Sequence, residues 1–245
     1  MVLVSLFAFL FSFLFALGGV GAAIILIPLL VMLGYPVNIA KPVGLFYNTI
    51  SLSSASYHNI KNKKLDFKLA IPIIISSFVF APIGAFASKF VPSKTVLFLF
   101  ILFLIFSSAM FLFFKSKKYA SSYREDIPFL YVFFVGMFSG FISGLLGVGG
   151  GSIISPLLLM AGFNPKRIAS VTAFVVPFSS FAAFITYLSM GHIRWILLIT
   201  VSFFGILGAY LGTVVMHKKL NHTLVKRIIA IILLAVAIKM ILKLI

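Results

Sequence analysis

The sequence predicts an all-α polytopic membrane protein with two inverted repeats, each a re-entrant or broken helical hairpin plus about three full transmembrane helices. Its 245 residues are 62% hydrophobic and only 9% charged, whereas soluble domains carry about 25% charged residues. Several apolar runs exceed the roughly 20 residues that cross a bilayer. An internal duplication is the third observation, and it predicts the repeats.

The duplication is clearest around two glycine clusters. LGGVGAAIILIPLLVMLGY (residues 17–35) aligns with LLGVGGGSIISPLLLMAGF (residues 145–163), and 10 of the 19 positions are identical. Gly-Val-Gly, a proline and a later glycine match in register, which apolar bias alone would not produce. The predicted repeats are residues 1–114 and 128–245 of one integral membrane domain, joined by a solvated, cytoplasmic linker at residues 115–127.

Each repeat divides into five apolar segments. In the first repeat they are 2–17, 22–33, 40–60, 69–88 and 93–114, and in the second they are 128–146, 150–161, 167–190, 195–215 and 223–244. The second segment of each repeat has only about 12 residues, and such a helix is about 18 Å long. The hydrocarbon core is about 30 Å thick, so we expect this segment to be a half-helix.

The 20 lysines and arginines predict the orientation of the repeats. If the first two segments of each repeat form a hairpin on one face, 14 basic residues fall on one side and 6 on the other. This bias satisfies the positive-inside rule. Five complete crossings per repeat give the same division, so both arrangements stay open. Either arrangement gives the repeats opposite orientations in the cytoplasmic membrane and places both termini on its outer side. The net charge of +17 is explained by lysines and arginines that keep the connecting loops on the cytoplasmic side. No nucleic-acid partner is expected.

The glycine clusters lie where the first segment of each repeat turns into the half-helix. In transporters with inverted repeats, such broken helices form the binding site near the midplane. The first amides of a helix lack intrahelical acceptors, and the helix dipole adds partial positive charge there. Two converging ends predict an anion site, although glycines also serve close helix packing. The expected site residues here are Gly19, Gly21, Ala22, Ala23, Gly149, Gly150, Gly151 and Ser152.

Neutral polar residues in the third segments are further candidates. Asn48 and Thr49 follow the first half-helix, while Thr172, Ser179 and Ser180 occupy the corresponding span of the second repeat. They could donate hydrogen bonds to an oxyanion, although serine and threonine often bond their own helix backbone. We include Asn48, Thr49 and Thr172 in the expected substrate site.

Charged residues are rare within the spans. Lys41 could attract anions, but a lysine that extends to the membrane surface is the commoner explanation. The three acidic residues, Asp66, Glu125 and Asp126, fall in predicted loops. Many pumps carry protons on acidic residues inside the membrane. We expect no such residue in this chain.

The duplicated Gly-Val-Gly, the following Pro-Leu-Leu and the Met-x-Gly resemble the sulfite exporter TauE/SafE family of membrane permeases, over essentially the whole chain. The resemblance implies two homologous halves and transport of sulfur-containing anions such as sulfite, sulfonates or sulfoacetate. The first copy departs from the pattern, because Ala22 and Ala23 replace glycines and Ile24 stands opposite Ser152. The resemblance therefore does not imply equal binding at both turns.

These observations predict a secondary transporter, or permease, for a small anion, with a sulfur oxyanion or organosulfonate such as sulfite as the expected class. An anion-selective channel is the alternative, since the same helix ends would line a pore. No enzyme activity, cofactor or metal is expected, because the chain has no cysteine and no coherent set of histidines or buried acids. The expected partners are the anion and the lipid bilayer, and a homo-oligomer stays open.

Overall fold

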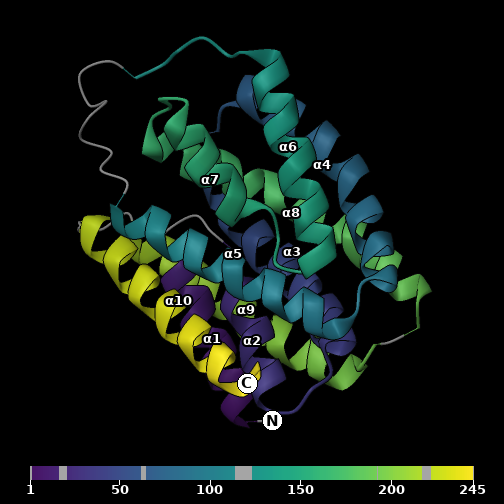
Figure 1. Cartoon of the computed structure of the whole chain (residues 1–245). Helices are drawn as coiled ribbons and strands as arrows, with labels where there is room; N and C mark the ends of the chain where they lie inside the picture. The colour runs from purple at the N-terminus through teal and green to yellow at the C-terminus, as the bar shows by residue number, and fades with distance from the viewer. Residues whose placement is uncertain are drawn as a thin grey trace.

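The computed structural model describes residues 2–16, 21–61, 65–113, 123–191, 193–216 and 222–244. The first repeat contains α1 (Val2–Ala16), α2 (Ala23–Met32), α3 (Val37–Lys61), α4 (Phe67–Ala87), the 3-10 turn η1 (Ser88–Phe90) and α5 (Ser93–Phe113). The second contains α6 (Phe129–Leu146), α7 (Gly151–Met160), α8 (Pro165–Ser189), α9 (Trp195–Met216) and α10 (His222–Leu244). All ten predicted segments are helices, with ends within three residues of the prediction, so the helical fold is confirmed (Figure 1).

Capping residues explain where several helices begin and end. Asp66 precedes α4 and accepts a hydrogen bond from the Leu69 amide at 3.2 Å. Asn164 precedes α8 and accepts one from the Lys166 amide at 2.9 Å. Gly147 follows α6 with a φ of 82°, a left-handed conformation that glycine adopts without a Cβ clash.

Helix length and surface composition fit a membrane-spanning bundle. Within the described residues, α4 with η1, α5, α6, α8 and α9 are long and apolar enough to cross a bilayer. Large apolar side chains such as Phe78, Phe138 and Phe203 are exposed on the outside of the bundle, where lipid would cover them. Both features are those of a polytopic helical membrane protein.

The short helices also follow the prediction. Both α2 and α7 have 10 residues, so each is about 15 Å long and shorter than the hydrocarbon core. However, α6, which we assigned to a hairpin, has 18 residues, whereas its counterpart α1 has 15. The choice between a re-entrant hairpin and full crossings stays a prediction.

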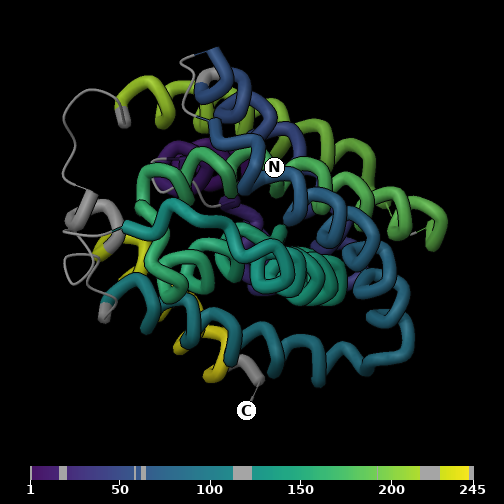
Figure 2. Tube along the Cα trace, turned by 90° about the horizontal axis from the view of Figure 1, so that it is seen from above, coloured from purple at the N-terminus to yellow at the C-terminus, as the bar shows by residue number. Residues whose placement is uncertain are grey.

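The two repeats pack through equivalent pairs of helices. The first helix of each repeat packs against the fourth helix of the other, which pairs α1 with α9 and α6 with α4. The two third helices, α3 and α8, pack together, as do the two fifth helices, α5 and α10. Figure 2 shows α5 and α10 along one edge and α9 along the opposite edge. Such equivalent pairs are expected when the two repeats are related by a two-fold axis. That the repeats have opposite orientations in the membrane stays a prediction.

Several glycines allow these helix pairs to approach closely. On α6 and α9 a Cβ would overlap the backbone of the facing helix, α4 or α1, at Gly136, Gly140, Gly144, Gly208 and Gly212. All five positions form small-xxx-small steps, because Gly136, Gly140 and Gly144 are spaced by four, as are Gly208 and Gly212. Close packing, which we kept as the alternative for the glycine clusters, therefore explains these other glycines.

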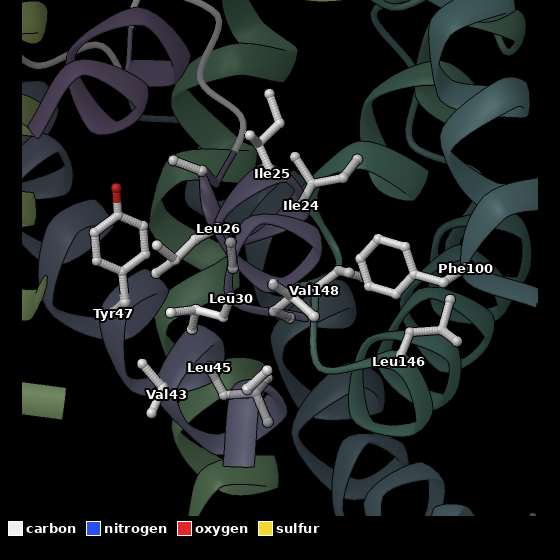
Figure 3. Packing of buried hydrophobic residues seen from close by; sticks show 14 of the residues in the cluster. Ile24, Ile25, Leu26, Leu30, Val43, Leu45, Tyr47, Phe100, Leu146 and Val148 are labelled. Atoms are coloured by element: carbon white, nitrogen blue, oxygen red, sulfur yellow. The ribbon is translucent and has the colours of Figure 1, made fainter. Parts of the chain in front are cut away.

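The apolar core surrounds the short helix α2. Ile24, Leu26 and Leu30 of α2 are fully buried, and Phe100 of α5 belongs to the same cluster. Figure 3 shows these side chains together with Val148, which comes from the turn between α6 and α7. The core therefore holds α2 against the beginning of the second half-helix.

Candidate functional site

The structure brings the starts of the two half-helices together. We call residues 147–150, between α6 and α7, the second glycine turn, and residues 21–22, before α2, the described end of the first. Asn48 lies between them on α3 and is fully buried. Its Oδ1 accepts a hydrogen bond from the Ala23 amide at 3.0 Å, and its Nδ2 donates one to the Val148 carbonyl at 2.8 Å. One side chain, 25 residues from Ala23 and 100 residues from Val148 in sequence, therefore joins the two half-helix starts.

The glycines at this junction are required by space as well as by conformation. A Cβ on Gly21 or on Gly149 would overlap the Asn48 amide group. Gly149 also has a φ of 76°, which other residues adopt only at a cost of roughly 1–2 kcal/mol. A Cβ on Gly151 would lie 3.0 Å from Thr172 Cγ2 and 3.7 Å from the Gly21 nitrogen. Without side chains at these positions, the two turns can meet.

The start of α7 presents backbone amides at this junction. The Gly150 carbonyl accepts the first helical hydrogen bonds, from Ile153 at 3.0 Å and Ile154 at 2.9 Å. The amides of Gly151 and Ser152 come before these donors, so α7 contains no earlier carbonyl that can accept their hydrogen bonds. At the start of α2, by contrast, the Ala23 amide already donates its hydrogen bond to Asn48. The two ends are therefore unequal, and α7 is the better candidate for an anion.

Ser180, which the sequence named only among several polar residues of its span, is a further candidate for the site. It lies on α8, is fully buried, and its Oγ has no hydrogen-bond partner among the described residues. That oxygen is 3.2 Å from the position a Cβ on Gly149 would take. The sequence placed Ser180 among the polar residues of its span, but only the packing of α8 on the second glycine turn shows that it faces the junction.

The other expected residues have the following environments. Thr49 donates to the Leu45 carbonyl of its own helix at 2.9 Å, and Thr172 Oγ1 lies 3.4 Å from Ser155 Oγ. Ala22 and Ser152 are also buried. The expected residue Gly19 lies outside the described residues. Every expected residue that is described is buried, so this conformation of the junction is closed to solvent.

The acidic residues lie away from this junction. All three precede helices or lie in the linker, as predicted. Asp66 forms an ion pair with Arg167, whose Nε donates to Asp66 Oδ2 at 2.6 Å. Arg124 donates to both Asp126 oxygens, at 2.8 and 2.7 Å, and this hydrogen bonding lowers the pKa of the Asp126 carboxyl. The junction itself holds no carboxylate within the described residues.

Comparisons with known proteins agree with the helical membrane fold. A model of the family described as sulfite exporter TauE/SafE matches residues 4–240. The probable membrane transporter protein MJ0441 of Methanocaldococcus jannaschii is 32% identical over 196 residues, which are 76% of this chain and 72% of that protein. The probable membrane transporter protein YunE of Bacillus subtilis is 25% identical over 237 residues, 84% of this chain and 85% of that protein.

A plant protein matches over a shorter stretch. Sulfite exporter TauE/SafE family protein 5 of Arabidopsis thaliana is 38% identical over 80 residues, which are 33% of this chain and 18% of that protein. No solved structure matches the chain.

Proposed function

Because the chain belongs to the sulfite exporter TauE/SafE family of membrane transporters, we propose that it is a secondary transporter for a small anion. The expected substrates are sulfur oxyanions or organosulfonates such as sulfite, carried across the cytoplasmic membrane. The observation that supports this best is the meeting of two half-helix N-termini at Asn48, in a buried junction. Backbone amides and helix dipoles at such ends favour negative charge.

The binding site that we propose is the junction of the glycine turns. The Gly151 and Ser152 amides would donate to the oxyanion, and the Ser180 hydroxyl, which has no partner among the described residues, would add a neutral donor. Asn48 acts as a positioning residue, because both ends of its amide already hold the turns. An oxyanion needs several donors that water would otherwise supply, and this junction offers them without a nearby carboxylate.

Transport would then follow from rearrangement of the two repeats around this junction. The buried site residues describe a conformation closed to solvent, so a substrate must enter after helices move apart. Repeats related by inversion can open first to one side and then to the other by exchanging conformations. Asn48, Gly149 and Ser180 lie at the contact of α3, α8 and the second turn, where such a movement would expose them.

Uptake by purified protein in liposomes tests this function. Labelled sulfite, sulfate, thiosulfate and methanesulfonate should be compared with labelled glucose and sodium as non-anionic controls. We expect saturable uptake of at least one sulfur anion. Absence of flux and of binding for all four anions would contradict the proposal, and single-channel currents would favour an anion-selective channel instead.

The proposed topology can be tested by labelling single cysteines. The natural chain has no cysteine, so Glu125→Cys in the linker and Pro36→Cys between α2 and α3 each give one exposed thiol. The distribution of basic residues predicts that an impermeant maleimide labels Pro36→Cys in intact cells and labels Glu125→Cys only after lysis. Labelling of Glu125→Cys in intact cells would refute this topology.

Transport should not depend on the acidic residues. Asp66→Asn keeps an oxygen that can accept from the Leu69 amide but loses the ion pair with Arg167, at a cost of about 1 kcal/mol in stability. Because no carboxylate lies at the junction, we expect most of the uptake to remain in liposomes. Asp126→Asn is the matched control, since it breaks the exposed pair with Arg124. A folded Asp66→Asn protein without uptake would show that this carboxylate takes part in transport.

A further inference from the structure

Lys41 is a buried cation at the second glycine turn. Only 4% of its surface is exposed, and it is the one charged residue in the buried class among the side chains that the structure describes. The sequence favoured a lysine that extends to the membrane surface, and the structure contradicts this. Its side chain lies inside the protein because α3 packs against the turn that follows α6, where a Cβ on Gly147 would lie 2.8 Å from Lys41 Cβ.

The groups around Lys41 provide no counter-ion. Its Nζ lies 5.8 Å from the centre of the Tyr187 ring. The Tyr187 hydroxyl is engaged elsewhere, since it donates to the Gly144 carbonyl at 2.9 Å and lies 2.7 Å from Ser88 Oγ. The two ion pairs found in the described residues use Asp66 and Asp126. Glu125, the remaining acid of the chain, is exposed in the linker.

A buried ammonium without a counter-ion is costly, because desolvation is not offset by an opposite charge. The aromatic ring offers only a partial substitute. An anion from solution would complete the site. Binding of an anion would also explain why a lysine, and not an apolar residue, stands at this position. Packing against Gly147 alone needs no charge.

Lys41 is also aligned with the proposed binding site. Lys41 and Asn48 are seven residues apart on α3, and Ser180 and Tyr187 are seven apart on α8. Seven residues are about two helical turns, or about 10.5 Å. Lys41 and Tyr187 lie at the Gly147 end of the second turn, whereas Asn48 and Ser180 lie at the Gly149 end. The two helices thus border one turn, with the charge at one end and the donors at the other.

We propose that Lys41 is the charge-selecting residue of this transporter, which holds the negative group of the substrate as it enters the junction of the glycine turns. This inference rests on the proposed anion transport. The aligned position in the second repeat is Ser170, so one cation serves the site. Because Coulomb energy scales with the product of charges, a dianion depends on Lys41 more than a monoanion does.

The test compares Lys41→Met with the natural protein in liposomes, using thiosulfate as the dianion and methanesulfonate as the monoanion. The exposed Lys89 on η1 supplies the matched control, Lys89→Met. We expect Lys41→Met to weaken apparent affinity roughly ten-fold for methanesulfonate and roughly a hundred-fold for thiosulfate. Lys89→Met should change neither. A structural role alone would lower the amount of folded protein and leave the ratio of the two affinities unchanged.

Size-exclusion chromatography and thermal melting establish that each variant folds, and Lys41→Gln replaces Lys41→Met if the latter does not. If neither folds, thermal stabilisation of the natural protein gives the comparison, and we expect more stabilisation by thiosulfate than by methanesulfonate. Equal stabilisation, or unchanged affinities in a folded Lys41 variant, overturns the role of Lys41 while the proposed transport stands. If the natural protein neither binds nor moves any anion, the proposed function itself fails.

Discussion

Replacing Gly149 with alanine is expected to abolish anion binding and transport. The new Cβ would overlap the Asn48 amide and lie 3.1 Å from Val176 Cγ1, so the second glycine turn must move away from α3 and α8. The residue would also have to keep a φ of 76°, at a cost of roughly 1–3 kcal/mol. Both effects separate the start of α7 from the start of α2, and the proposed site requires their contact.

Gly191→Ala provides the control for the Gly149 variant. Gly191 has a φ of 78°, almost the same as Gly149, but a Cβ there would meet nothing within 4 Å. It lies between α8 and α9, outside the junction. Thiosulfate binding by calorimetry and uptake in liposomes should be lost in Gly149→Ala and kept in Gly191→Ala. If folded Gly149→Ala binds with unchanged affinity, the anion site lies elsewhere and this glycine serves packing.

The fold could be read largely from the sequence, because apolar segment length and the duplicated motif are local properties. The half-helices α2 and α7 illustrate this, since each is short for a reason visible in its own segment. The roles of individual glycines could not be read in this way. Gly144 faces the backbone of α4, whereas Gly149 faces Asn48, and only the packing of distant helices distinguishes the two.

The meeting of the two half-helix starts was predicted in outline, and the details of this candidate site depend on contacts between distant segments. Asn48 was expected to face the substrate, but it bonds Ala23 and Val148 and so positions both turns. Ser180 and Lys41 gain their importance from the approach of α8 and α3 to the second turn. Neither residue carries a sequence signal that differs from an ordinary helix serine or a membrane-surface lysine.

Asn48→Asp is expected to abolish transport at neutral pH. An ionised carboxylate still accepts from the Ala23 amide, but it cannot donate to the Val148 carbonyl, which Asn48 reaches at 2.8 Å. Leaving that buried carbonyl without a donor costs about 1–3 kcal/mol. More importantly, the carboxylate introduces negative charge at the site proposed for an anion. We therefore expect thiosulfate uptake to fall by at least about a hundred-fold, as two like charges in a buried site repel strongly.

Acidification separates the effect of charge from the effect of shape. A protonated aspartic acid is close in shape to asparagine and regains a donor for the Val148 carbonyl. Burial favours this neutral form, so uptake by Asn48→Asp should recover as the pH falls, while uptake by the natural protein should not rise in parallel. Thiosulfate and methanesulfonate suit this assay because their charges stay constant over the mildly acidic range. Asn38→Asp, at an exposed position on the same helix, controls for an added charge. Normal thiosulfate affinity in folded Asn48→Asp that persists as the pH is raised into the alkaline range, where the carboxylate ionises, would place the anion away from this junction, since no oxyanion binds tightly beside an unpaired buried carboxylate.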